Sequence, residues 1–233
     1  MESKTHQVEC HNCRLANGCL AKGLDGDEIK QLETIISHKR PLKPSEFLYR
    51  QDDQAQSLFV VKSGSFRSTV LDAEGIEHTV DFHLPGELIG LEALQKGLFR
   101  GSVEALETAS VCELPLAQLS PLSSKIPGLQ SQLLHIIGSQ FAAQHDRAAL
   151  LGNHPASEKT ARFLLMLSHR YSNLGYSSTE FNLSMPRYHI ASFLCLSLET
   201  VSRQLGRLKE KGLISVQKRG IHINSLESLK SSI

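Results

Sequence analysis

The spacing of apolar and polar positions divides the chain into a β-rich first half and a helical remainder. Between about residues 41 and 115, short apolar runs alternate with turn signals such as Asp72-Ala73-Glu74-Gly75 and Pro85-Gly86. Short strands separated by glycine, proline and aspartate are typical of a sandwich or jelly roll. The predicted strands are Phe47–Tyr49, Leu58–Val61, Ser65–Leu71, Thr79–Phe82, Leu88–Gly90, Val103–Thr108 and Ser110–Leu114.

A long helix is predicted from Pro127 to about Leu151, because apolar residues recur there at helical spacing. Part of this pattern lies close to the coiled-coil period, which favours a seam between two copies of the chain. The alternative is a helix that only covers its own β-domain. The predicted seam consists of Leu133, Ile137, Phe141, Gln144, Ala148 and Leu151.

The last third of the chain predicts a winged helix-turn-helix. A helix over about residues 156–172 precedes two short helices, at about 187–194 and 198–211, which Cys195-Leu196-Ser197 separates. The remaining pattern, from Leu213 through Lys218-Arg219 to Ile223, predicts a β-hairpin.

The predicted fold class is therefore α+β, with an N-terminal cysteine segment at 1–24 and a β-roll at 25–120. A dimerisation helix at 121–152 and a winged helix-turn-helix domain at 153–233 follow. A helix is predicted to begin within the roll domain near Asp25 or Asp27, either of which suits an N-cap.

The net charge of +1 conceals an asymmetry between the two parts. The first 154 residues carry 14 Lys/Arg and 19 Asp/Glu, whereas the last 79 carry 11 and 5. A basic terminal module favours a polyanion partner, most simply double-stranded DNA, although a merely solvated basic face is the alternative.

The second short helix contains a candidate base-reading face. Glu199, Ser202 and Arg203 share the outer face near its N-terminal end, the part that reads bases in the major groove. Arg203 suits guanine, and Glu199 suits the amino group of cytosine. An exposed i,i+4 ion pair is the alternative explanation of Glu199 and Arg203. Predicted phosphate contacts are Arg207, Lys209, Lys211, Lys218 and Arg219.

Four of the five cysteines form a candidate metal site. Cys10, Cys13 and Cys19 form a C-x2-C-x5-C run, and Cys112 lies in a predicted strand. An all-thiolate site suits an iron–sulfur cluster or zinc. A thiol-redox enzyme is disfavoured, because C-x-x-C activation normally needs a thioredoxin-like context that is missing here. Neither a signal peptide nor an apolar stretch long enough to cross a membrane is apparent, so we expect a cytoplasmic protein.

Taken together, these motifs resemble the CRP/FNR superfamily of transcription regulators, and within it the fumarate and nitrate reduction regulators. The resemblance covers nearly the whole chain. It is carried by the cysteine run with Cys112, the segment Ala105-Leu106-Glu107-Thr108, the long helix and Glu199-Thr200-Val201-Ser202-Arg203.

This resemblance implies a β-roll of the cyclic-nucleotide-binding type and a function as a regulator rather than an enzyme. It implies that Cys10, Cys13, Cys19 and Cys112 hold an oxygen-labile [4Fe–4S] cluster. The loaded protein would dimerise on a palindrome such as TTGAT-N4-ATCAA. Oxygen would convert the cluster to [2Fe–2S] and release the DNA. Surface loops such as 72–75 and 94–100 are expected to face RNA polymerase. A zinc-stabilised or other-effector regulator of the same superfamily, without oxygen sensing, is the alternative.

Departures from the family pattern lead to further expectations. Ser102 follows Gly101 at the position where cyclic-AMP-binding relatives carry the arginine that holds the nucleotide phosphate. Arg100 lies one place too early, and a shift of one residue on a strand turns the side chain to the other face, which disfavours a cyclic-nucleotide site. Cys195 occupies the helix-turn-helix turn, where glycine is usual because positive φ is often needed. The family carries a repelling acid near the seam, whereas this chain has Gln144 in the predicted seam. We therefore expect the metal-free protein to dimerise more tightly than is typical of the family, unless Asp146 takes the place of that acid.

Overall fold

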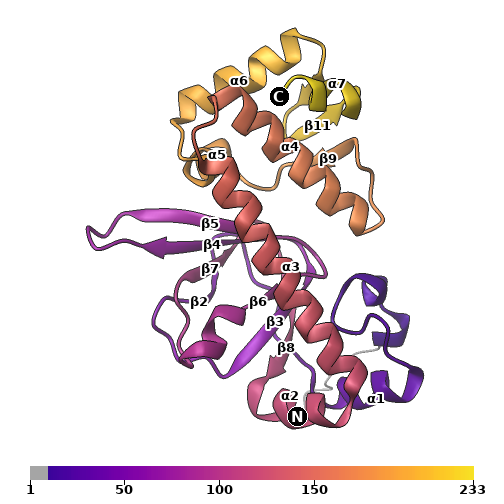
Figure 1. The fold of residues 1–233 in the computed structure, drawn as a ribbon. Helices are drawn as coiled ribbons and strands as arrows, with labels where there is room; N and C mark the ends of the chain where they lie inside the picture. The colour runs from indigo at the N-terminus through magenta and orange to yellow at the C-terminus, as the bar shows by residue number, and fades with distance from the viewer. Residues whose placement is uncertain (1–9) are drawn as a thin grey trace. The chain divides into compact units, whose positions relative to one another are not determined.

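The computed structural model describes residues 10–233 and has the predicted α+β architecture (Figure 1). The described chain forms two compact units. The first extends to Val70 and resumes over Phe82–Phe141, and the second comprises Leu71–Asp81 and Ala142–Ile233. The domain limits predicted at residues 24, 120 and 152 stay predictions. No helix within residues 10–233 is both long enough and apolar enough to cross a membrane.

The β-roll consists of two four-stranded sheets, which matches the predicted jelly roll. All seven predicted strands are present, and the two-residue strand β1 is additional. One sheet has the order β1 (Ser37–His38), β8 (Ser110–Pro115), β3 (Ser57–Ser63) and β6 (Leu88–Ile89). The other has the order β2 (Phe47–Tyr49), β7 (Ser102–Ala105), β4 (Phe66–Leu71) and β5 (Glu77–His83).

Helix α1 (Gly26–Ile35) begins where the sequence predicted, at Asp25. The Asp25 carboxylate accepts from the backbone N–H groups of Asp27 and Glu28, and the Glu28 carboxylate accepts from the Asp25 N–H. This capping box satisfies amides that the first helical turn leaves unpaired. The cap therefore fixes where the preceding cysteine segment ends and the helix starts.

Helix α2 (Leu116–Lys125) was not predicted, because Pro121 lies inside it. Proline removes an intrahelical hydrogen bond and usually breaks a helix. Here the helix persists and buries Leu119 in the same hydrophobic cluster as Leu114 and Leu129. Tertiary packing thus outweighs the local penalty.

Helix α3 (Pro127–Leu151) has the predicted bounds. Its first turns contribute fully buried Leu129 and partly buried Leu133 and Ile136 to the cluster beneath the cysteine segment. The indigo N-terminal segment and α1 lie beside this part of α3 in Figure 1. One face of the helix is therefore already covered by its own unit.

The second unit contains the winged helix-turn-helix. A three-stranded sheet of order β10-β11-β9 accompanies the helices, and α4, α5 and α6 enclose a core that includes Phe163, Phe193 and Val201. Strand β9 and helix α7 were not predicted. The elements are α4 (Ala156–Asn173), β9 (Glu180–Asn182), α5 (Arg187–Leu194), α6 (Leu198–Glu210), β10 (Ile214–Gln217), β11 (Gly220–Ile223) and α7 (Leu226–Ser231).

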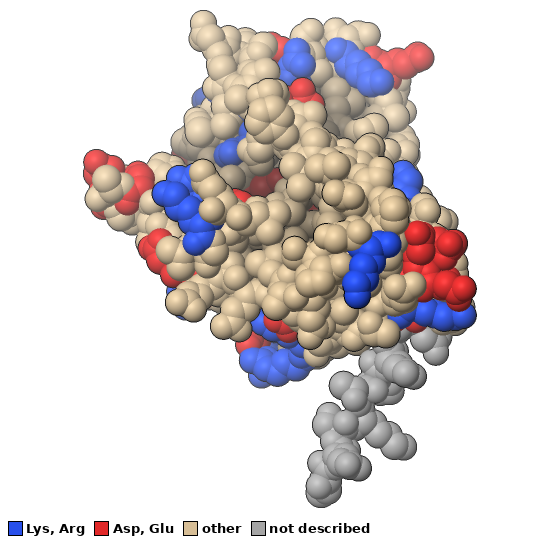
Figure 2. Space-filling view, turned by 60° about the horizontal axis from the view of Figure 1, so that its bottom comes forward, with Lys and Arg blue, Asp and Glu red and all other residues tan. Residues whose placement is uncertain are grey.

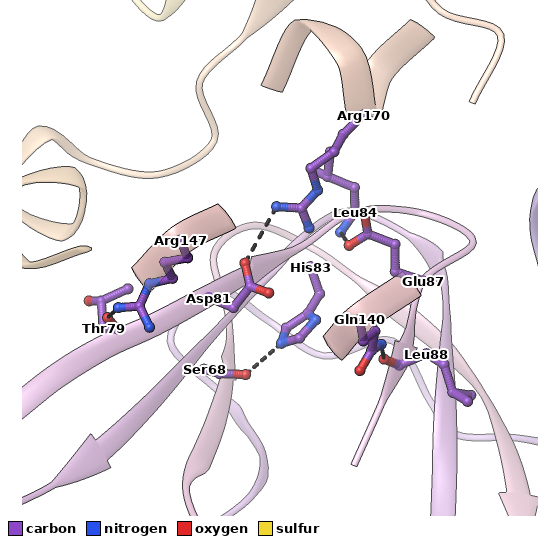
Figure 3. A network of polar contacts seen from close by, with 10 residues as sticks. All are labelled: Ser68, Thr79, Asp81, His83, Leu84, Glu87, Leu88, Gln140, Arg147 and Arg170. Carbon is purple, nitrogen blue, oxygen red and sulfur yellow. Dashed lines mark hydrogen bonds and ion pairs between the residues drawn. The ribbon is translucent and has the colours of Figure 1, made fainter. Parts of the chain in front are cut away.

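Residues 71–81 pack within the second unit through polar contacts (Figure 3). The Thr79 N–H donates to the Ser192 hydroxyl at 3.0 Å, and its carbonyl accepts from Arg147 at 2.9 Å. Arg170 approaches the Asp81 carboxylate at 3.4 Å. These bonds join the segment to helices α3, α4 and α5.

Candidate functional site

All four predicted ligand cysteines line one cavity of about 390 Å³ in the first unit. Cys10, Cys13 and Cys19 enter from the N-terminal segment, and Cys112 enters from β8, although it lies more than 90 residues further along the chain. The rest of the lining is mainly apolar. It comprises Asn12, Arg14, Leu15, Leu20, Ala21, Leu32, Ile36, Val60, Lys62 and Leu114.

Local turns place three of the thiols on a compact loop. Cys10 opens a 3-10 turn (Cys10–Asn12), and its carbonyl accepts from the Cys13 N–H at 3.1 Å. A second 3-10 turn, Ala16–Gly18, delivers Cys19 at its end. Cys112 instead sits in the middle of a sheet, opposite His38 on one side and Val60 on the other. The site thus combines three thiols from a loop of tight turns with one from a strand paired on both sides.

Glu33 on α1 holds the start of this loop. Its carboxylate accepts from the backbone N–H of Cys10, and it lies 3.2 Å from His11 Nδ1. The Glu33 side chain is mostly buried, with 17% exposed. The sequence alone does not indicate this residue, because its contact with the loop spans 23 positions.

Burial raises the pKa of three predicted ligand thiols, those of Cys10, Cys19 and Cys112. Desolvation, followed by the nearby cysteines and Glu33, raises the pKa of Cys10 to about 12. Desolvation likewise raises the pKa of Cys112 to about 11, against a smaller opposing effect of Lys62. Desolvation also raises the pKa of Cys19. Such thiols stay protonated at neutral pH until a bound positive centre replaces their protons.

The residues present fit an iron–sulfur cluster in donor type and in setting. Four soft sulfur donors share one largely apolar cavity, and Leu15 and Leu20 line it as expected of shielding residues. Among residues 10–233, however, no three His, Cys, Asp or Glu side chains are grouped as they would be around one metal ion.

Helix α6 presents the predicted base-reading face. Its N-cap, Ser197, accepts from the Thr200 N–H at 3.2 Å. Glu199 and Arg203 are exposed and Ser202 is half-buried, whereas Val201 and Leu205 anchor the opposite face in the core. The backbone N–H of Glu199, then the Ser197 hydroxyl, lowers the pKa of the Glu199 carboxyl, which keeps it an acceptor.

The wing brings two predicted phosphate contacts to the surface. Lys218 and Arg219 form the two-residue turn between β10 and β11, and both side chains are exposed. Lys218 adopts φ 52°, a left-handed conformation typical of such turns. Arg207 on α6 is exposed as well.

Arg187, at the start of α5, was missed by the sequence analysis. Its guanidinium approaches the Ser202 hydroxyl at 3.4 Å, which places a cation beside the predicted base-reading face. Charged side chains on the face of the molecule drawn in Figure 2 form small groups of either sign on a mostly uncharged surface.

The predicted seam residues differ in their exposure. Ile137 and Phe141 are 40% and 64% exposed, and Gln144 and Ala148 are exposed too. Leu133 instead packs partly against its own unit, and Leu151 is half-buried. Leu134, absent from the prediction, is 64% exposed.

The region that would face a cyclic nucleotide is engaged in internal contacts. Glu87 accepts from the Leu84 N–H at 2.9 Å, and the Ser102 hydroxyl accepts from the Gln51 N–H at 3.0 Å. The rings of Tyr49 and Phe99 stack 3.6 Å apart in the roll's core.

Cys195 has the backbone conformation expected from its position in the turn. It caps α5 with φ 52° and ψ 46°, and its side chain is exposed. The left-handed conformation expected at the position of a usual glycine is therefore confirmed.

Two domain families match this chain. Residues 39–125 match the cyclic nucleotide-binding domain, and residues 158–232 match the Crp-like helix-turn-helix domain. Together these matches cover the β-roll and the winged helix-turn-helix described above.

Curated relatives match over almost the whole chain. The anaerobic regulatory protein of Aggregatibacter actinomycetemcomitans is 37% identical across 95% of this chain and 86% of its own. The fumarate and nitrate reduction regulatory protein of Yersinia pestis is 34% identical across 98% of this chain and 92% of its own. The transcriptional activator protein anr of Pseudomonas aeruginosa is 38% identical across 93% and 89%.

Among solved structures, FixK2 from Bradyrhizobium japonicum superposes with a TM-score of 0.76 at 28% identity. The match covers 84% of this chain and 96% of FixK2. The fold, the two domain matches and the full-length relatives confirm the resemblance stated from the sequence. The chain belongs to the CRP/FNR superfamily of transcription regulators, within the branch of the fumarate and nitrate reduction regulators.

Proposed function

We propose that this protein is an oxygen-responsive transcription regulator whose cysteine cavity holds a [4Fe–4S] cluster. The observation that carries the proposal is the meeting of Cys10, Cys13, Cys19 and Cys112 in one cavity. Three come from a loop and one from a sheet, so binding closes the loop onto the β-roll. The names of the anaerobic and fumarate–nitrate relatives support a role in anaerobic gene control.

Four thiolates suit either a cluster or a zinc ion. The likeness to anaerobic and fumarate–nitrate regulators favours the cluster. When bound, the cluster supplies the oxygen-sensitive redox chemistry. The residues of this chain hold it and limit its exposure to water.

DNA recognition in this proposal requires two copies of the chain. The exposed apolar side chains of Leu134, Ile137 and Phe141 lie along α3 and can pair with a second copy. A two-fold dimer presents two α6 helices to a palindromic site, with Glu199, Ser202 and Arg203 reading each half. A monomer keeps half of those contacts, so loss of the dimer releases DNA.

Other parts of the proposal follow from the same fold. We expect no cyclic nucleotide in the roll, because Tyr49 and Phe99 occupy its core and Glu87 is bonded to its own turn. RNA polymerase is the expected protein partner, as the family implies. The cytoplasm, where DNA and reduced thiols coexist, is the expected location.

DNA binding under controlled oxygen tests this proposal. The anaerobic, cluster-loaded protein is titrated with a labelled TTGAT-N4-ATCAA duplex, before and after exposure to air, and compared with the Cys112→Ser variant. We expect tight binding only by the unexposed wild type. Equal binding by all samples would contradict oxygen control and leave DNA recognition standing.

A further inference from the structure

The cysteine loop and the long helix share one hydrophobic cluster. Cys10 and Leu20 of the loop are buried in it together with Leu129 of α3, and Leu133 and Ile136 pack against its edge. Packing of α3 on the roll therefore depends on where the loop lies.

The start of α3 approaches the end of the loop closely. At Gly128, an added Cβ would meet Leu24 Cδ2 at 3.1 Å and the Glu28 carboxylate at 3.3 Å. These distances are tighter than ordinary van der Waals contact, so the absence of a side chain lets the helix begin directly against the loop.

A side chain one turn later on α3 contacts the loop backbone. Gln132 Nε2 donates to the Cys19 carbonyl oxygen at 3.1 Å, across 113 positions of sequence. The same carbonyl accepts from the Lys22 N–H at 3.1 Å, which belongs to the turn that follows Cys19. Gln132 is half-buried, and the exposed Ile137 and Phe141 follow it on the same helix.

We infer that Gln132 is a positioning residue that couples the conformation of the cysteine loop to helix α3. A loop ordered around the cluster holds the Cys19 carbonyl where Gln132 can donate to it, which fixes the first turns of α3 and the seam beyond them. A rearranged loop withdraws that carbonyl and frees the helix. The inference rests on the proposed function and assigns this residue its part in regulation.

A matched pair of variants tests the inference. Gln132→Glu keeps the size of the side chain but removes the N–H donor, because a carboxylate only accepts. Gln130→Glu makes the same charge change two residues earlier, where the side chain is exposed. For each protein, sedimentation equilibrium gives the dimer Kd with the cluster bound and after demetallation, and the ratio of the two measures the coupling.

We expect the coupling ratio of Gln132→Glu to fall about ten- to hundredfold, because each lost hydrogen bond is worth about three- to tenfold and a two-fold dimer contains the bond twice. The ratio of Gln130→Glu should equal that of the wild type, even if both of its Kd values shift with the added charge. Equal ratios in the two variants would overturn the inference alone. A wild type whose Kd does not depend on the cluster would overturn the proposed function as well.

Amide hydrogen exchange of the wild type gives a test that needs no variant. Removal of the cluster should speed exchange in residues 129–137 of α3 and leave the α7 amides unchanged. Unchanged exchange in residues 129–137 would overturn the coupling.

Discussion

Truncation of Phe141 should weaken the dimer strongly while sparing the fold of the single chain. Its side chain is 64% exposed, which leaves about 130 Å² of a side chain of about 200 Å² for a partner to cover. At about 25 cal/mol per Å², that area corresponds to about 3 kcal/mol. An alanine retains about a third of it, so Phe141→Ala loses about 2 kcal/mol in each chain.

A two-fold interface contains the side chain twice, which brings the loss to about 4 kcal/mol, or about a thousandfold in dimer Kd. Sedimentation equilibrium of the cluster-loaded protein measures this Kd. Leu94→Ala is the control, because Leu94 is 50% exposed but lies outside α3. Urea unfolding of monomeric Phe141→Ala should stay within about 0.5 kcal/mol of the wild type. A dimer Kd within threefold of the wild type, or an equal loss in Leu94→Ala, would refute the seam.

Three further predictions concern the other parts of the chain. Arg203→Ala should cost about 1–3 kcal/mol per half-site and relax the preference for one base, whereas Lys218→Ala should weaken all sequences alike, as a competition assay on mutated duplexes would show. Cys195→Gly should raise the free energy of unfolding by about 1 kcal/mol, because the residue holds φ 52°, and a lower urea midpoint would contradict this. In the demetallated protein at pH 8, iodoacetamide should modify exposed Cys195 well before buried Cys10. Because the pKa of Cys10 is raised to about 12, its reaction should accelerate only as the pH rises towards that value. Peptide mass mapping would show the order of modification.

The sequence predicted the elements whose signals are local. The limits of α3 and α5 agree with the prediction, because helical periodicity and flanking breakers defined both. Helix α2 was not predicted, because Pro121 locally disfavours a helix; the burial of Leu119 explains why the helix forms. Strand β1, with two residues, is too short to carry a periodic signal.

The sequence predicted the thiols of the candidate site but not the residues that hold the cysteine loop in place. Cysteine type and spacing identified the thiols, while Glu33 and Gln132 contact the loop only through tertiary folding. The seam illustrates the same limit, because a periodic stripe does not reveal which of its residues face the protein's own core. Leu133 lies against that core, whereas its neighbour Leu134 is exposed.

The most direct test of the account is the visible absorption spectrum of anaerobically purified protein, with iron and zinc quantified, followed through a pulse of air. The account predicts a brown protein with about four irons per chain, whose spectrum changes to that of a smaller cluster when oxygen is added. A colourless protein that still contains zinc after anaerobic reconstitution would contradict it.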